Sequence, residues 1–500
     1  GTNSVQESDG NYGSAYAHIR RTNLLLQNAS NYANQTDIAQ YVGEAKFFRA
    51  YFYFELVQLY GDAIIVKKPL DVTDPELKTV RNDRSEVIDF AIEDLEAAAE
   101  LLPKFSELST EDNGRISQEG CWAFLSRVAL YEGTWQKSRG NAERGKALLD
   151  IAAKASGKVI ASNTFSLFKP EALGDSAQKY MFILEDVKSN PAGLQKSANK
   201  EYIFSRRHDE VLAPIGTNIT KGSLINVIWV SRKFANMYLC QDGLPIEKSE
   251  MFDLSKGYDK MDSEFMNRDN RMKSIIDMDA QTTAAKELKT GTSGYGNMKF
   301  VCKERANLKE SPDYPVLRLA EVYLIYAEAV CERNNGEVTD EQLNYSINKL
   351  RGRAGIANLT NALIDKIKAG TGTTKSKGEV MLDEIRRERA VELYMEGSRF
   401  NDLKRWGIAE DELNESHMGT VVGNAAYPTT FVDASGNATG KYSKNTYVWG
   451  EEQIDTQWGK LNCVVVDDKT NFKFSRSNYL WPLPQQQISL NTSLVQNPGY

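Results

Sequence analysis

The sequence has 500 residues, of which 41% are hydrophobic and 10% aromatic, so it is long enough to bury one or more large cores. Its formal net charge of -7 excludes the basic surface that nucleic-acid binding requires, and no apolar run approaches the roughly 20 residues that cross a membrane. The five cysteines lack metal or redox spacing, so we expect buried small apolar residues and no disulfide framework.

Apolar residues recur at helical spacing through the first third of the chain. The pattern predicts helices over 16–30, 41–60, 84–102, 118–131 and 142–160. Gly61 stops the second of these helices and Pro103 ends the third. The same spacing predicts later helices over 317–333, 339–353 and 377–394. Because these helices come in pairs with small residues at close intervals, similar to tetratricopeptide units of about 34 residues, we expect a mostly helical scaffold of stacked pairs.

The rest of the chain lacks helical periodicity. We expect helical scaffold pieces at about 14–161 and 316–406, and irregular parts, rich in Gly, Asn, Asp, Ser and Thr, at about 162–315 and 407–478. Short strands are predicted at 202–204 and 299–301. Since scaffold pieces flank the irregular middle on both sides, we predict a single domain spanning residues 1–500.

The chain ends in a segment that cannot continue a helix. Pro482 and Pro484 follow a hydrophobic triplet that begins at Tyr479, and two prolines so close are incompatible with a helix interior or a central strand. We therefore expect residues 479–500 to be an extended tail, pinned by its aromatic and apolar side chains onto the body of the protein.

The most charged segment runs from Asp383 to Arg405. Its acidic and basic residues lie three to four apart and share a helical face. An acid–base pair or an anion site is one interpretation. An ion-pair network that holds this helix to the tail and to a neighbouring helix is favoured, because every carboxylate has an arginine within reach. Gly397 would then mark a close approach or a helix cap.

Four blocks of sequence carry a family resemblance. They are Gly43–Asp62 (GEAKFFRAYFYFELVQLYGD), Arg318–Ala329 (RLAEVYLIYAEA) with Leu350–Gly355 (LRGRAG), Ile385–Gly407 (IRRERAVELYMEGSRFNDLKRWG), and the tail from Tyr479. Weaker likenesses lie at Arg127–Gly133, Asp242–Gly243 and Arg268–Met272. In this order the blocks resemble the SusD/RagB family of nutrient-binding outer-membrane lipoproteins of Bacteroidetes, over nearly the whole chain.

The resemblance implies a SusD-like fold of tetratricopeptide-like helix pairs with a large irregular, loop-rich ligand-binding half. It also implies a lipoprotein on the extracellular face of the outer membrane that serves as a lid on a SusC-type TonB-dependent transporter. Family members bind glycans, and some bind peptides or other nutrients. The lipidation cysteine expected ahead of the first helix is not in this chain, so the lipid anchor is implied by the resemblance alone.

Sugar binding requires flat aromatic rings beside amides and carboxylates, because a pyranose packs its apolar face on a ring and bonds through its hydroxyls. Tyr295 is the first candidate, since glycines on both sides favour exposure of its ring. The alternative for each aromatic residue is a loop anchor packed against the body. The candidate ligand-binding residues are Tyr295, Asn297, Trp229, Tyr447, Trp449, Trp458 and Tyr12.

No catalytic, cofactor or metal motif is recognised. The three histidines, His18, His208 and His417, share no motif, and the usual phosphate loops are absent from the sequence. We therefore predict a non-catalytic protein that captures oligosaccharides and delivers them to the transporter, with no cofactor. Three alternatives stay open: a peptide- or other-nutrient-binding protein of the same type of uptake complex, a glycoside hydrolase on a helical scaffold, and a protein-interaction scaffold.

Overall fold

The computed structural model describes residues 4–186, 189–215, 219–224, 228–252, 265–275, 293, 295–302, 309–421, 453–456 and 459–500. The chain divides into two compact units. The first comprises Gly1–Thr164, Phe400–Leu413 and Lys473–Tyr500, and the second comprises Phe165–Arg399 and Asn414–Phe472. The scaffold piece predicted at 14–161 therefore falls in the first unit, and the piece predicted at 316–406 is divided between the two. The single domain predicted for residues 1–500 stays a prediction.

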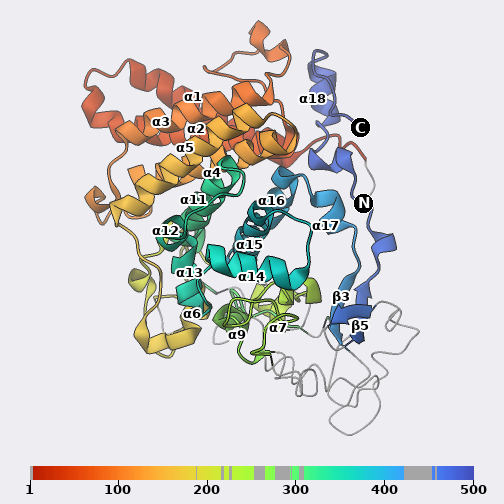
Figure 1. The fold of residues 1–500 in the computed structure, drawn as a ribbon. Coiled ribbons are helices and arrows are strands. Elements are labelled where there is room, and N and C mark those ends of the chain that lie inside the picture. The colour runs from red at the N-terminus through yellow and green to blue at the C-terminus, as the bar shows by residue number, and fades with distance from the viewer. Residues whose placement is uncertain are drawn as a thin grey trace. The chain divides into compact units, whose positions relative to one another are not determined.

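The first unit is built from long helices that pack against one another in sequence order (Figure 1). They are α1 (Gly10–Ser30), α2 (Ala39–Tyr60), α3 (Arg84–Leu101), α4 (Gln118–Ser138) and α5 (Ala142–Ser162), joined by α16 (Arg399–Trp406), α17 (Ala409–Leu413) and α18 (Gln485–Leu490). The five predicted helices of this region are confirmed. α1 begins earlier than predicted because Asp9 caps it, accepting a hydrogen bond from the Asn11 N–H. Gly61 ends α2 with a positive φ of 79° that favours glycine.

Two buried ion pairs join neighbouring helices of the first unit. Arg49 on α2 contacts Asp94 on α3, and Arg84 on α3 contacts Glu132 on α4, each at 2.7 Å. Around them lies an apolar core in which Val57, Leu95 and Val128 are fully buried. The apolar face of each amphipathic helix thus supplies the core that the sequence pattern predicted.

The C-terminal tail contacts the end of α2. The Trp481 N–H donates to the Leu59 carbonyl at 2.7 Å, and Asn497 Nδ2 donates to the Tyr60 carbonyl at 2.9 Å. Leu483 between the two prolines is fully buried. The expectation of an extended chain throughout is wrong for α18, because Pro484 occupies the N-cap position, where a proline does not hinder the helix that follows it.

The second unit combines short helices with two small antiparallel sheets. Its elements are α6 (Ala177–Met181), β1 (Tyr202–Arg206), α7 (Ile219–Leu224), α8 (Arg232–Ala235), α9 (Asn270–Ile275), β2 (Tyr314–Arg318), α11 (Leu319–Arg333), α12 (Asp340–Tyr345), α13 (Ile347–Ala354), α14 (Asn361–Thr371), α15 (Lys377–Glu392), β3 (His417–Val421), β4 (Gln453–Thr456) and β5 (Gly459–Asp467). β1 pairs with β2, and β5 lies between β3 and β4. Figure 1 shows β3 and β5 side by side. The mostly helical class predicted from the sequence is confirmed.

One predicted strand is right and one is wrong. Residues 202–204 lie in β1, as predicted. Residues 299–301 form a turn and not a strand. Phe300 has a φ of 62°, outside the extended region, and the Lys299 ammonium is buried against Glu396 at 2.6 Å. A buried ion pair thus prevails over the strand propensity of Phe300 and Val301.

The charged segment from Asp383 to Arg405 is two helices and not one. α15 ends at Glu392, and Met395 and Gly397 adopt positive φ values of 59° and 82° before α16 begins. Among the residues that the structure describes, no atom lies within 4 Å of the position that a Gly397 Cβ would occupy. The glycine therefore serves the left-handed backbone, and the expected close approach is wrong.

Candidate functional site

The predicted binding residues fall into three groups. Tyr447, Trp449 and Trp458 lie outside the described residues. Tyr12 is buried in the first unit, with its ring edge-on to Tyr60 at 5.2 Å. In the second unit Tyr295 and Asn297 are 1% and 2% exposed, whereas Trp229 is partly exposed. The expectation that flanking glycines expose the Tyr295 ring is therefore wrong.

Tyr295 supports the segment that carries Trp229. Its carbonyl accepts the N–H of Val230 at 3.1 Å, and its ring belongs to an apolar cluster with Val230, Tyr238 and Phe265. The glycines did not expose the ring because its apolar surface packs into this cluster, where burial stabilises it. Asn297 is likewise internal, with Nδ2 donating to Ser223 Oγ at 3.0 Å.

Trp229 lies at one end of a row of three partly exposed rings. The centroids of Trp229 and His417 are 6.3 Å apart with the rings inclined by 73°, and those of His417 and Phe472 are 4.5 Å apart with an angle of 43°. All three rings are partly exposed. We call this row, Trp229–His417–Phe472, the aromatic ridge.

Strand pairing and a capped turn place the ridge residues together. His417 begins β3 and is paired with Asp467 at the end of β5. The next residue, Asp468, caps the turn at Lys469–Asn471 by accepting from the Thr470 N–H, and the Phe472 N–H closes it by donating to the Lys469 carbonyl at 3.0 Å. This turn places the Phe472 ring next to the His417 ring.

α8 is attached to β3 beside the ridge. Arg232 Nε donates to the Gly419 carbonyl at 2.9 Å, and Lys233 forms an exposed ion pair with Glu415 at 2.6 Å. Trp229 lies three residues ahead of Arg232, so these contacts hold its segment close to His417. Neither His417 nor Phe472 was predicted from the sequence, because they are far apart in it and lie in no motif.

Polar groups lie next to the rings. Asn471 Nδ2 donates to Asp467 Oδ1 at 2.6 Å, and both residues are accessible at the surface. Rings offer an apolar platform, and amides and carboxylates offer donors and acceptors for hydroxyl groups. The combination is what a pyranose requires.

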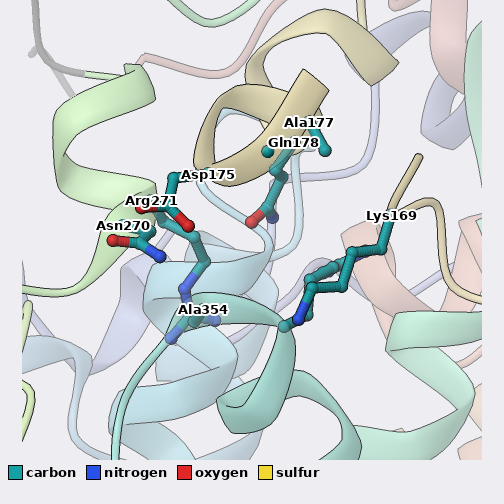
Figure 2. Close-up of a pocket in the computed structure, with 9 residues that line it drawn as sticks. Lys169, Asp175, Ala177, Gln178, Asn270, Arg271 and Ala354 are labelled. Carbon is teal, nitrogen blue, oxygen red and sulfur yellow. The ribbon is translucent and has the colours of Figure 1, made fainter. Parts of the chain in front are cut away.

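A small pocket elsewhere in the second unit is polar (Figure 2). Lys169, Asp175, Gln178, Asn270 and Arg271 are among the residues that line it, at the junction of α6, α9 and α13. Its volume of about 10 Å³ has room for about one water molecule and is far below the roughly 300–1,000 Å³ of typical ligand pockets. It therefore suits water or a small ion better than a sugar.

The pocket borders a buried network of ion pairs, the kind of interaction that the sequence predicted for the charged segment, but the arginines that pair with α15 come from α9, β2 and α13 and not from the tail. Arg271 on α9 pairs with Glu388 and Glu392 on α15 at 2.6 and 2.7 Å. Arg318 and Arg353 also contact Glu392. Burial alone would raise the pKa of the Glu392 carboxyl, but the three arginines hold it well below its usual range. Such mutual pairing is typical of structural networks and gives no general acid.

Glu396 anchors the far end of this network. Lys299 Nζ lies 2.6 Å from Glu396 Oε1. Burial lowers the pKa of the Lys299 ammonium to about 8, although Glu396 opposes that change. The lysine is fully buried, so no substrate could reach it.

Two properties of the described residues bear on function. In that part of the chain no cluster of three or more histidine, cysteine, aspartate or glutamate side chains has the geometry to hold a metal ion. No helix there has the length and apolar character to cross a bilayer. The five cysteines are buried, as expected.

Comparison with known families identifies the class of protein. A family model described as "SusD family" matches residues 190–500, which is more than half of the chain. A second model, described as "Starch-binding associating with outer membrane", matches residues 2–130. The chain therefore belongs to the SusD family, as its sequence predicted.

Two relatives are similar over part of their length. A SusD-like protein of Bacteroides ovatus is 24% identical over 375 residues, which are 73% of this chain and 58% of that protein. The starch-binding protein SusD of Bacteroides thetaiotaomicron is 27% identical over 188 residues, 38% of this chain and 22% of that protein. The chain thus spans less than two thirds of the length of either relative.

Solved structures share the fold. A SusD-like protein of Bacteroides fragilis has a TM-score of 0.67 at 20% identity and covers 98% of this chain and 86% of its own. A laminarin-binding SusD-like protein has a TM-score of 0.55 at 21% identity and covers 99% and 87%. These likenesses confirm the SusD-like fold.

Proposed function

We propose that this protein captures oligosaccharides on the extracellular face of the outer membrane and delivers them, chemically unchanged, to a SusC-type TonB-dependent transporter. The observation that carries the proposal is the aromatic ridge beside Asp467 and Asn471. Membership of the SusD family supports it, as do the starch-binding and laminarin-binding relatives. The description of the second family model, which names association with the outer membrane, supports the location.

The ridge suits glycan capture for a physical reason. A pyranose gains by covering a flat ring, but its hydroxyls exchange bonds to water for bonds to protein, so the net gain per contact is small. A row of rings compensates by contacting successive sugar units. We expect affinities in the micromolar to millimolar range, roughly 4–8 kcal/mol.

Calorimetric titration against starch and laminarin oligosaccharides tests the proposal. We expect the Trp229→Ala and Phe472→Ala variants to bind at least tenfold more weakly than the wild type. Tyr345→Ala, which removes a 38% exposed ring from α12 of the same unit, is the matched control and should bind normally. Unchanged affinity in both ridge variants would exclude the ridge as the site.

The rival functions predict other results. A peptide-binding protein would retain peptides and ignore every oligosaccharide of the panel. A glycoside hydrolase would shorten the oligosaccharides, which chromatography of the titrated mixture would detect. Delivery is tested by co-purification with a SusC-type transporter, which a captured oligosaccharide should accompany.

A further inference from the structure

We infer that the Asp467–Asn471 pair binds the sugar hydroxyls at the aromatic ridge and makes this site select neutral glycans over uronic or sulfated ones. The inference rests on the proposed function and names its substrate class.

The pair is continuous with the ridge through the backbone. Asp467 is the cross-strand partner of His417, the central ring. Asn471 immediately precedes Phe472, the terminal ring. A sugar lying on His417 and Phe472 would therefore have its edge beside the carboxylate and the amide.

The hydrogen bond between the two side chains orients them before a ligand arrives. Asn471 Nδ2 donates to Asp467 Oδ1 at 2.6 Å, and the Asn471 N–H donates to the Asp468 carbonyl at 2.9 Å. A carboxylate has about four acceptor positions, and an amide has two donor hydrogens and a carbonyl. This hydrogen bond uses one acceptor position of Asp467 and one donor hydrogen of Asn471, so further acceptors and one donor stay available for neighbouring hydroxyls. Because the two side chains are already oriented, binding costs little additional ordering entropy.

The charge around the pair opposes anionic ligands. Asp468 follows Asp467 directly, and hydrogen bonds from the backbone N–H and the side chain of Thr470 lower the pKa of its carboxyl, which keeps it ionised. Of the two cations on α8, Lys233 is paired with Glu415 and Arg232 donates to the Gly419 carbonyl. Lys469 in the turn and Lys473 after Phe472 are exposed to solvent. A carboxylate or sulfate placed at the Asp467 carboxylate, where the sugar hydroxyls would bond, would meet like charge from Asp467 and Asp468.

The test compares oligosaccharides of equal length and different charge. Maltoheptaose and laminariheptaose are the neutral probes, and a heptamer of galacturonic acid is the acidic probe. We expect the wild type to bind a neutral probe at least tenfold more tightly than the acidic one. Asp467→Asn, which removes the charge and keeps the shape, should shift the acidic-to-neutral affinity ratio by roughly fivefold toward the acidic probe.

Asn471→Ala should weaken neutral binding about tenfold and leave that ratio unchanged, since it removes hydrogen bonds and no charge. Asp365→Asn, an equivalent change in an exposed acid on α14, is the control and should alter neither quantity. An unchanged ratio in Asp467→Asn, or a wild type that binds the acidic probe as tightly as the neutral ones, would overturn the inference. If either of these outcomes were found while Trp229→Ala still abolished oligosaccharide binding, the inference would fail and the proposed function would stand. A wild type that bound neither neutral probe would overturn both.

Discussion

Arg318 holds Glu396 by two parallel hydrogen bonds. Its Nε and Nη2 donate to Oε2 and Oε1 at 2.6 and 2.8 Å, and the two side chains are 1% and 7% exposed. Arg318 is the last residue of β2, and Glu396 lies in the turn after α15. Because two parallel bonds fix both distance and plane, this pair sets the position of the turn relative to the small β1–β2 sheet.

Removing Arg318 should therefore destabilise the second unit strongly. Arg318→Leu leaves Glu201, Glu392 and Glu396 buried with one cation fewer. Loss of one partner of a buried pair costs roughly 3–5 kcal/mol. We expect a clear fall in the midpoint of thermal unfolding. Lys375→Leu removes an exposed ion pair on the same unit and should cost below about 1 kcal/mol. Equal effects of the two changes would contradict the structural role of the network.

The helices could be predicted from sequence because their signals are local. The spacing of apolar residues located α2, α3 and α5 to within a few residues, and Gly61 marked the end of α2 where a positive φ is needed. For the region around Glu392, the sequence predicted that an ion-pair network would form but did not predict its partners. Its partners Arg271, Arg318 and Arg353 lie on three different elements, and nothing in the charged segment itself names them.

The candidate site was harder to predict because it depends on contacts between distant segments. Trp229 was found from its residue type alone. His417 and Phe472 join it only after β3 pairs with β5 and the turn at Lys469–Asn471 reverses the chain. Tyr295 was misjudged for a related reason, since its glycine neighbours are local but the apolar cluster that buries its ring is assembled from distant residues.

Lys404 should make the stability of the first unit depend on pH. Its Nζ donates to the Gln58 carbonyl at 2.6 Å, and burial, reinforced by Arg84 and Arg139, lowers its pKa from 10.5 to about 7. Between these values the unfolded chain binds a proton that the folded chain does not. The cost of burying Lys404 is therefore absent from the free energy of unfolding above about pH 10.5. It grows as the pH falls to about 7, by about 1.4 kcal/mol per pH unit.

Lys404→Met removes that dependence. We expect the free energy of unfolding of the wild type, relative to the variant, to rise between pH 7 and pH 10 in chemical denaturation. Loss of the hydrogen bond to the Gln58 carbonyl changes the free energy of unfolding of the variant by an amount that does not vary with pH. Lys78→Met, on an exposed lysine, should give a pH profile parallel to that of the wild type. If the pH profile of Lys404→Met were parallel to that of the wild type, the pKa of Lys404 would not be lowered in the folded protein.

Asn497 should hold the tail on α2. Its Nδ2 donates to the carbonyls of Tyr60 and Trp481 at 2.9 and 2.7 Å, and its Oδ1 accepts from Arg81 at 3.0 Å. Asn497→Ala removes these three hydrogen bonds, at a cost of roughly 1–3 kcal/mol in total. Amide hydrogen exchange at Trp481 should then accelerate about tenfold or more. Val495→Ala, at a 74% exposed tail residue, is the control and should leave that exchange unchanged. Slow exchange in Asn497→Ala would assign the docking to the apolar contacts of the tail.

Gly378 should not tolerate alanine, although it lies in a helix. Alanine in an exposed helix is usually about 1 kcal/mol better than glycine. At Gly378 on α15, however, a Cβ would lie 2.7 Å from the Asn335 carbonyl oxygen and 2.8 Å from the Gly336 Cα, so backbone would have to move. We expect Gly378→Ala to destabilise the second unit by roughly 1–3 kcal/mol, measured as a lower thermal midpoint.

Gly370→Ala on α14 is the matched control for this prediction. In the described part of the chain no atom lies within 4 Å of the Cβ position there, so the change should stabilise by about 0.4–1 kcal/mol through the unfolded chain. The two variants share chemistry and helical setting and differ in the space around the new methyl group. Opposite signs of the two midpoint shifts are therefore the expected result. If both variants gained stability, the close approach of Asn335 and Gly336 to the start of α15 would be refuted.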